Sequence, residues 1–139
     1  MQTIDFLKKT NYKELLKTKP ADPSVGIKLS NELGIYIAEV LPSPGLVNPH
    51  FHKKGGELYF ILEGSGTMHI GKPQQKDGKL VSDYLSKHEL REGGSFIVKA
   101  GEVHCLKNNS KEKSLIIAFI CPQEHMDNSK DREFVQNSP

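Results

Sequence analysis

The most informative segment of the chain is His50-Phe51-His52-Lys53-Lys54-Gly55-Gly56-Glu57. Its first three residues are predicted to form a short strand, so the side chains of His50 and His52 leave the same face. Their Cα atoms are then about 6.5 Å apart, at ~3.3 Å of rise per residue, which lets both rings reach one ion. Glu57 opens the next predicted strand and offers a carboxylate as a third ligand. Farther along the chain, His104 follows a glycine turn and is a candidate fourth ligand.

The segment lies in a region of short apolar or alternating runs. These runs are rich in β-branched and aromatic residues and end at Gly, Pro, Asn or Ser, a pattern that predicts β-strands. Many strands at short spacing, without helical periodicity of comparable length, indicate a barrel or a sandwich. The expected strands are Ile27–Ser30, Ile35–Leu41, His50–His52, Leu58–Glu63, Thr67–Ile70, Ser95–Lys99, Val103–Lys107 and Ser114–Cys121.

Two connections between these strands carry turn signals. The link Gly64-Ser65-Gly66 has the length of a hairpin loop, so Leu58–Glu63 and Thr67–Ile70 are predicted to pair antiparallel. Residues 72–92 interrupt the strand pattern with polar residues and contain the turn signal Asp77-Gly78. This segment is interpreted as an insertion, for which an extra long hairpin and a lid over a pocket mouth both stay open.

The two ends of the chain differ from its centre, which is rich in glycine and proline. Asn11, followed three positions later by Glu14, has the pattern of a capping box and predicts a short helix near residues 11–18. Beyond Pro122 the chain is polar, and we expect it to fray. The three predicted parts are an N-terminal helical arm at residues 1–25, a β-barrel at residues 26–121 and a polar C-terminal tail at residues 122–139.

Length and composition exclude several classes of protein. A chain of 139 residues suffices for one domain, and its 36% hydrophobic and 26% charged residues are typical of a globular protein. A net charge of +2, without a basic cluster among aromatic residues, argues against nucleic acid as a partner. No apolar run reaches the roughly 18 residues of a membrane helix, so we expect no membrane partner. The first residues have no signal-peptide core, so we expect a cytoplasmic protein.

The spacing around the two histidines resembles the first motif of the cupin family. His50 and His52 are separated by one residue, Glu57 follows after four more, and Gly64 follows after another six. The glycine ahead of this motif, Gly45, is one residue closer to His50 than is usual in that family. This departure touches a loop and leaves the four proposed ligands in place.

A second segment resembles the second cupin motif. Gly93, Gly101, His104 and Asn108 fall at its spacings, and Lys99 stands where the family usually has proline. The replacement concerns the turn ahead of His104 and none of the proposed ligands. In the resembled motif the asparagine is mostly structural, so Asn108 is interpreted as a hydrogen-bonding residue at a turn or strand end.

The resemblance implies an all-β fold. The expected architecture is a double-stranded β-helix, or jelly-roll cupin barrel, of two antiparallel sheets with the short N-terminal helix added. It also implies one divalent transition metal ion inside the wider mouth, whose identity among Mn, Fe, Co, Ni, Cu and Zn stays open. The implied protein ligands of the ion are His50, His52, Glu57 and His104.

Four protein ligands leave open positions on an octahedral ion, where an oxygen of a small molecule can bind. We therefore expect a metal-dependent enzyme acting on a small oxygenated substrate, of the dioxygenase, isomerase or epimerase, or decarboxylase type found among similar single-domain cupins. The alternative is a non-catalytic module that binds a sugar or an organic acid through the ion. Because two-sheet barrels expose apolar faces and edges, we also expect a homodimer.

Two further residues are candidates for catalysis. Tyr59 shares strand parity with Glu57, so it is predicted to face the interior, with its hydroxyl bound either to substrate or to a neighbouring carbonyl. His69 could reach the interior as an acid, a base or a spare ligand, but its register is open. Cys105 is next to His104 but is predicted to point away from it and to be a packed, unreactive thiol.

Overall fold

The alternating segments of the chain form strands that build two antiparallel sheets. The computed structural model describes residues 9–17, 27–28, 34–127 and 129–139. Residues 29–30 of the first predicted strand and most of the predicted N-terminal arm lie outside the described residues. The described helices and strands are α1 (Lys9–Leu16), β1 (Ile27–Lys28), β2 (Gly34–Val40), β3 (His50–His52), β4 (Glu57–Glu63), β5 (Ser65–Lys76), β6 (Lys79–Arg91), β7 (Ser95–Val98), β8 (Val103–Asn108), β9 (Leu115–Cys121), the 3₁₀ helix η1 (Gln123–Met126) and β10 (Arg132–Phe134).

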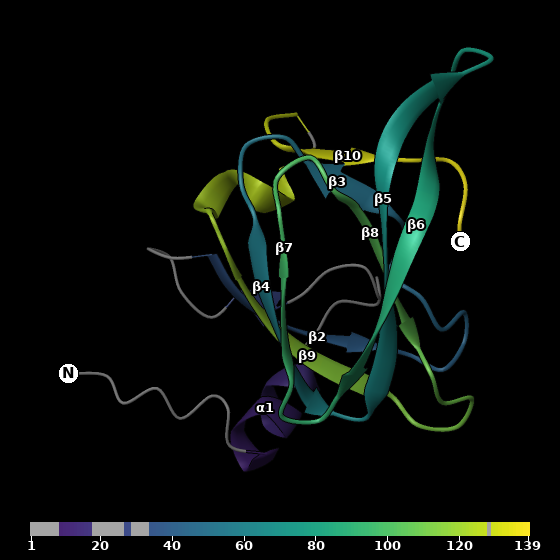
Figure 1. Ribbon diagram of the computed structural model, residues 1–139. Helices are drawn as coiled ribbons and strands as arrows, with labels where there is room; N and C mark the ends of the chain where they lie inside the picture. The colour runs from purple at the N-terminus through teal and green to yellow at the C-terminus, as the bar shows by residue number, and fades with distance from the viewer. Residues whose placement is uncertain (1–8, 18–26, 29–33, 128) are drawn as a thin grey trace.

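The strand order interleaves the two sheets. One sheet has the order β1-β2-β9-β4-β7 and the other has the order β10-β3-β8-β5-β6. Apart from the pairs β1–β2 and β5–β6, described strands that follow one another along the chain, such as β2 and β3 or β3 and β4, lie in opposite sheets, which face each other in Figure 1. This arrangement is a double-stranded β-helix, so the predicted all-β barrel with a short N-terminal helix is confirmed.

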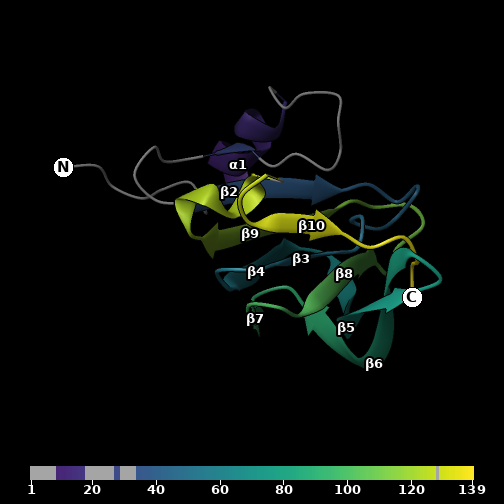
Figure 2. The same cartoon turned by 90° about the horizontal axis from the view of Figure 1, so that it is seen from above.

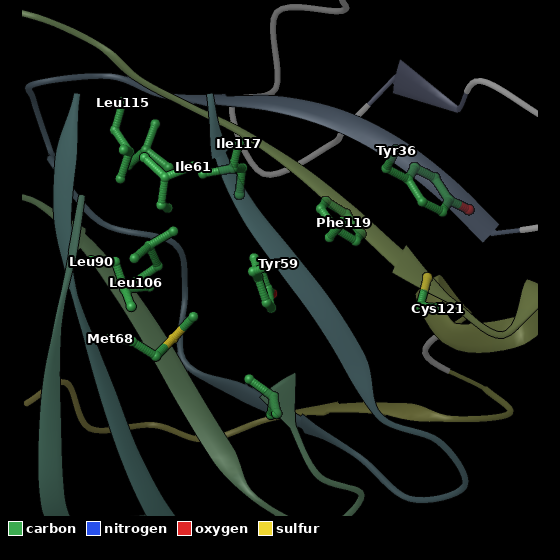
Figure 3. Close-up of a cluster of buried hydrophobic side chains, with 12 residues drawn as sticks. Tyr36, Tyr59, Ile61, Met68, Leu90, Leu106, Leu115, Ile117, Phe119 and Cys121 are labelled. Carbon is green, nitrogen blue, oxygen red and sulfur yellow. The ribbon is translucent and has the colours of Figure 1, made fainter. Parts of the chain in front are cut away.

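Inward-facing side chains fill much of the space between the two sheets with apolar groups. A buried aliphatic or aromatic side chain contributes roughly 1.5–3 kcal/mol, so this cluster holds the sheets together. Figure 3 shows its side chains between the ribbons of the barrel. The buried members are Tyr36, Val40, Tyr59, Ile61, Met68, Leu90, Val98, Leu106, Leu115, Ile117, Phe119 and Cys121.

Helix α1 lies on the outer face of the sheet that contains β2 and β9, as Figure 2 shows. Tyr12 and Leu16 are four residues apart, on one face of the helix, and pack against Ile37 and Ile116. The helix begins two residues earlier than the capping pattern predicts. Among the residues that the structure describes, no helix is long and apolar enough to cross a membrane.

The link Gly64-Ser65-Gly66 does not close a hairpin. Strand β4 pairs with β7 and β9, whereas β5 pairs with β6 and β8, so the link carries the chain from one sheet to the other. The predicted pairing of Leu58–Glu63 with Thr67–Ile70 is therefore wrong. The φ angle of Gly64 is +87°, a value that glycine adopts without steric cost, so this residue allows the chain to turn between the sheets.

Residues 72–92 belong mainly to a long hairpin of β5 and β6 that extends beyond the barrel (Figure 1). Asp77-Gly78 forms its tip with φ angles of 52° and 75°, as the primed hairpin turns require. The pairing of β5 with β8 ends at Gly71, so Pro73 removes no hydrogen bond from that pairing. Of the two alternatives for this segment, the structure shows the hairpin.

The described part of the C-terminal segment is anchored to the barrel. Strand β10 pairs with β3, which places it at one edge of its sheet. Val135 is buried with Phe51 and Val103, and the side chain of Asn137 makes two hydrogen bonds to the backbone of Ser82, at 2.7 and 2.8 Å. The expectation that this segment frays is therefore wrong, because its composition does not reveal these contacts.

Candidate metal centre

Four buried side chains meet in the interior of the barrel. Strand β3 supplies His50 and His52, β4 supplies Glu57, and β8 supplies His104. One nitrogen or carboxylate oxygen from each of them lies within 4.8 Å of those of the others. Their exposed fractions are 5%, 2%, 3% and 1%, respectively. The structure thus brings together the four residues that the sequence predicts as metal ligands.

Strand pairing explains why the rings converge. His50 on β3 is directly opposite His104 on β8, and the centroids of their rings are 4.3 Å apart. His52 follows two residues after His50, and the centroids of their rings are 5.0 Å apart. The prediction that the two side chains leave the same face of β3 is therefore confirmed. Glu57 opens β4 in the opposite sheet and reaches the three rings from across the barrel.

The turn before β8 connects two of the ligand-bearing segments. The N–H of Gly101 donates to the carbonyl of His52 at 2.7 Å, and its φ angle of +83° favours glycine. Lys99, which stands at the position of the usual proline, donates its N–H to the Glu102 carboxylate at 3.0 Å, and the N–H of Glu102 returns to the carbonyl of Lys99 at 3.1 Å. A proline at this position would lack the N–H that Lys99 donates. In this chain, hydrogen bonds between Lys99 and Glu102 therefore stabilise the turn before His104.

Two of the imidazole rings are oriented by backbone carbonyls. Nδ1 of His50 lies 2.7 Å from the carbonyl oxygen of Asn48, and Nδ1 of His104 lies 3.1 Å from that of Glu102. Because a carbonyl oxygen only accepts, these contacts favour the tautomer of each neutral ring in which Nδ1 carries the proton. In that tautomer Nε2 of each ring has a lone pair for a metal ion, although the Glu57 carboxylate beside Nε2 of His104 favours the other tautomer until an ion is bound.

Glu57 is the negative centre of the cluster. Its Oε1 lies 3.2 Å from Nε2 of His52 and 2.7 Å from Nε2 of His104. Burial, followed by the charge of His104, lowers the pKa of His50 well below its ordinary value of 6.5, which favours the neutral ring. Neutral imidazoles and one carboxylate are a donor set that suits a divalent transition metal ion, so the residues present fit the implied ion.

Tyr59 lies beside the cluster and faces the interior, as predicted. Its ring centroid is 6.1 Å from that of His104 and 5.5 Å from that of Phe119. Burial, followed by the charge of Glu57 and a hydrogen bond to it, raises the pKa of Tyr59 well above 10. The hydroxyl is therefore neutral and donates to the Glu57 carboxylate, a partner that the sequence did not predict.

His69 is not part of the cluster. Its neighbours Met68 and Ile70 pack in the core, so strand alternation turns His69 to the outer face of β5. There, partial burial and then the charges of two lysines lower its pKa. The structure thus places this predicted acid, base or spare ligand on the opposite face of the sheet from His104.

Two other residues that the sequence singled out have structural contacts. Sγ of Cys105 donates to the carbonyl of Val47 at 3.2 Å, and burial raises the pKa of the thiol to about 11, as expected for a packed, unreactive cysteine. Nδ2 of Asn108 donates to the carbonyls of Val40 and Lys113 at 3.0 and 2.7 Å. Asn108 therefore holds a strand end, as its position in the second motif predicts.

Asp131 is a neighbour of the cluster that the sequence did not predict. It is 2% exposed, and its Oδ2 lies 3.4 Å from Nδ1 of His52. In the sequence it is one of several acids in a polar segment, and only the apolar pair Phe134-Val135 indicates that this segment packs against the barrel.

Solved structures share the fold. A double-stranded β-helix protein from Klebsiella pneumoniae superposes with a TM-score of 0.59 at 17% identity, over 86% of this chain and 90% of that one. The capsular polysaccharide assembling protein CapF from Staphylococcus aureus gives 0.61 at 14% identity, over 80% of this chain and 29% of that one. A hydroquinone 1,2-dioxygenase, PnpCD, solved with Cd²⁺ and 4-hydroxybenzonitrile, superposes with a TM-score of 0.59 at 12% identity, over 79% of this chain and 69% of that one. At these identities the likeness shows the fold alone.

Curated relatives match about two thirds of the chain at higher identity. Nectarin-1 of Nicotiana plumbaginifolia is 32% identical over 94 residues, which are 67% of this chain and 38% of the relative. Germin-like protein subfamily 2 member 1 of Arabidopsis thaliana is 35% identical over 94 residues, which are 67% of this chain and 39% of the relative. The chain thus spans about two fifths of the length of the curated relatives that it matches.

The family comparison covers nearly the whole chain. Residues 9–138 match the family described as Cupin. Both motifs, the interleaved sheets and the buried cluster of three histidines and one glutamate lie within this match. The chain therefore belongs to the cupin family.

Proposed function

We propose that the chain is a metal-dependent enzyme that acts on a small oxygenated substrate. The observation that carries the proposal is the convergence of three imidazoles and one carboxylate, whose ligand atoms lie within 4.8 Å of one another in a buried site. Mn, Fe, Co, Ni, Cu and Zn are the candidate ions. When bound, such an ion polarises a substrate oxygen or lowers the pKa of a bound water. The ligands would be His50, His52, Glu57 and His104.

The other side chains of the site hold the ligand set in place. The carbonyls of Asn48 and Glu102 orient two rings from behind, and Tyr59 donates to Glu57 from the interior. Such contacts fix the direction of each ligand before an ion arrives. Phe119 and the apolar residues around it fill the neighbouring interior and exclude water, which strengthens electrostatic interactions within the site. Phe134 lies 5.6 Å from His50, measured between ring centroids, and is 38% exposed, so the cluster approaches solvent on this side.

Three reaction types fall within the proposal: those of dioxygenases, of isomerases or epimerases, and of decarboxylases. The hydroquinone 1,2-dioxygenase that shares the fold was solved with Cd²⁺, which supports a metal site in this type of barrel. A fold shared at 12% identity does not choose among the reactions, because one fold hosts many chemistries. The substrate is therefore proposed by class only, as a small molecule with an oxygen that can reach the ion.

A non-catalytic binding module is the second candidate, and one observation favours it. Of the two residues predicted to act in catalysis, Tyr59 is bound to Glu57, and His69 is on the outer face of the barrel. A site without a dedicated acid–base pair suits the capture of a sugar or an organic acid without turnover. The two candidates are distinguished by incubating metal-loaded protein with candidate ligands: a binding module returns them unchanged, and an enzyme does not.

The test of the metal site is elemental analysis of untagged protein. Wild-type protein supplied with each candidate metal is expected to retain one ion per chain after dialysis. His50→Ala and His104→Ala should lose the ion, because each removes a ligand, whereas the control His69→Ala removes a histidine from the outer face and should keep it. Wild-type protein that retains no supplied metal, or equal retention in all three variants, contradicts the proposal.

The partners and the location of the protein are also proposals. On the outer face of one sheet, Ile97 and Ile120 are 65% and 40% exposed, and both are in register with Leu58. This apolar row supports a homodimer, which light scattering tests: the mass of a single chain at micromolar concentration would contradict it. A cytoplasmic location and the absence of nucleic-acid and membrane partners stay predictions.

A further inference from the structure

Asp131, in the C-terminal segment, contacts the loop that joins β3 to β4. Its Oδ1 accepts the backbone N–H of Lys54 at 2.6 Å, and its own carbonyl accepts the N–H of Lys53 at 3.0 Å. Its other carboxylate oxygen, Oδ2, lies 3.4 Å from Nδ1 of His52. One buried carboxylate thus contacts both the loop between two ligand-bearing strands and the ring of a ligand.

Burial makes these contacts necessary. The side chain of Asp131 is 3% exposed, and a carboxylate removed from water is destabilising unless hydrogen bonds or a positive group compensate. The amide of Lys54 compensates at one oxygen, and the ring of His52 faces the other. Because a carboxylate only accepts, Asp131 favours the tautomer of His52 in which Nδ1 carries the proton, whereas Oε1 of Glu57, 3.2 Å from Nε2, favours the other tautomer until an ion is bound.

The position of Asp131 is fixed on both sides along the chain. The N–H groups of Asp131 and Arg132 donate to the carbonyl of Asp127, at 2.9 and 3.1 Å. Strand β10 then follows at once and pairs with β3, with Arg132 directly opposite His52. These contacts hold the backbone of Asp131 beside His52, and the N–H of Lys54 holds its carboxylate.

The three rings of the cluster are therefore oriented by two kinds of acceptor. Backbone carbonyls lie behind His50 and His104, whereas a side-chain carboxylate lies behind His52. We propose that Asp131 is a positioning residue: it favours the proton of His52 on Nδ1, in opposition to Glu57 at Nε2, so that the lone pair of Nε2 can bind the ion. This inference rests on the proposed metal site and adds a residue of the C-terminal segment to it. A carboxylate behind a ligating histidine also raises the basicity of the ligand.

Asp131→Asn tests the role directly. The amide keeps an oxygen for the N–H of Lys54 but presents an NH₂ group to Nδ1 of His52, which moves the ring proton to Nε2, the atom that the ion needs. We expect the zinc affinity, measured by competition with a chromophoric chelator, to fall about 10–100-fold. The matched control is Glu133→Gln, which removes a half-exposed carboxylate that lies 3.4 Å from Nζ of Lys53, and its zinc affinity should equal that of the wild type.

A second readout needs neither metal nor activity. Two-dimensional spectra of metal-free protein labelled with ¹⁵N-histidine report the tautomer of His52. The wild type is expected to contain the Nδ1–H form, because Asp131 opposes the preference of Glu57 for Nε2–H, and Asp131→Asn is expected to contain Nε2–H alone. Nε2–H alone in the wild type, or equal zinc affinity in wild type and Asp131→Asn, overturns the proposal. Wild-type protein that binds no zinc contradicts the proposed function instead, and the tautomers then still decide the role of Asp131. If Asp131→Asn does not fold, the wild-type tautomer decides it.

Discussion

The interior of the barrel has two parts of opposite chemistry on the same strands. Strand β8 carries His104 in the ligand cluster and, two residues later, Leu106 in the apolar cluster. Strand β4 carries Glu57 in the ligand cluster and Ile61 in the apolar cluster. All four side chains are nearly fully buried, so the difference between the two parts is one of chemistry rather than of exposure.

This difference separates stability from function within one core. The apolar part gains free energy from burial, whereas the ligand cluster takes imidazoles and a carboxylate out of water before any ion is bound. Substitutions in the apolar part should therefore lower stability and spare the site. Substitutions in the ligand cluster should change ion binding and the dependence of stability on pH.

Leu115→Ala should give the largest effect. Leu115 is fully buried in the apolar part, so its truncation leaves a cavity and should lower the free energy of unfolding by about 2–5 kcal/mol, measured by urea denaturation of the metal-free protein. The protein that stays folded should still bind one ion per chain. Loss of the ion at full stability would show that the two parts of the core are not separate.

Acid should lower the stability of the protein through the ligand cluster. The pKa of His50 is lowered in the folded protein, so below pH 6.5 the unfolded chain binds this proton first, and stability falls as the pH falls. The slope from this group reaches at most about 1.4 kcal/mol per pH unit. Urea denaturation of metal-free protein between pH 7 and pH 5 measures it. His50→Leu should have a shallower slope, and an unchanged slope would show that other groups set the acid response.

Tyr59→Phe should have a moderate effect on the site. It removes the hydroxyl that donates to Glu57, so the ion affinity should fall on the order of 10-fold, as for other groups that orient metal ligands. The matched control is Tyr84→Phe, which removes a hydroxyl bound to the carbonyl of Asn137 on the outer face. Each variant should lose about 1 kcal/mol of stability. Equal ion affinities in the two variants would contradict the role of Tyr59 at the site.

The smallest effect concerns Cys105, on the opposite face of β8 from His104. Because burial raises the pKa of its thiol to about 11, an alkylating reagent at pH 8 should modify it slowly in native protein and rapidly in urea. The unfolded thiol ionises near pH 9, so this group lowers stability as the pH rises above that value. Rapid alkylation of native Cys105, followed by mass spectrometry, would contradict the packed thiol.

Much of the ligand set could be predicted because it depends on local geometry. Residues two apart on a strand share a face, which places His50 beside His52 whatever the sheet order is. The corner at Gly64 could not be distinguished from a hairpin, because glycine serves both and the difference lies in which distant strands pair. Asp131 could not be predicted either, since its partner Lys54 is 77 residues away and a polar segment gives no signal of such a contact.

Crystals of metal-loaded protein measured at the absorption edge of the ion give the most direct test. The account predicts one anomalous peak per chain between the side chains of β3, β4 and β8, with histidine nitrogens at about 2.0–2.1 Å if the ion is zinc. A peak elsewhere on the protein, or no peak after loading, would contradict it. The expected ligands at that peak are His50, His52, Glu57 and His104.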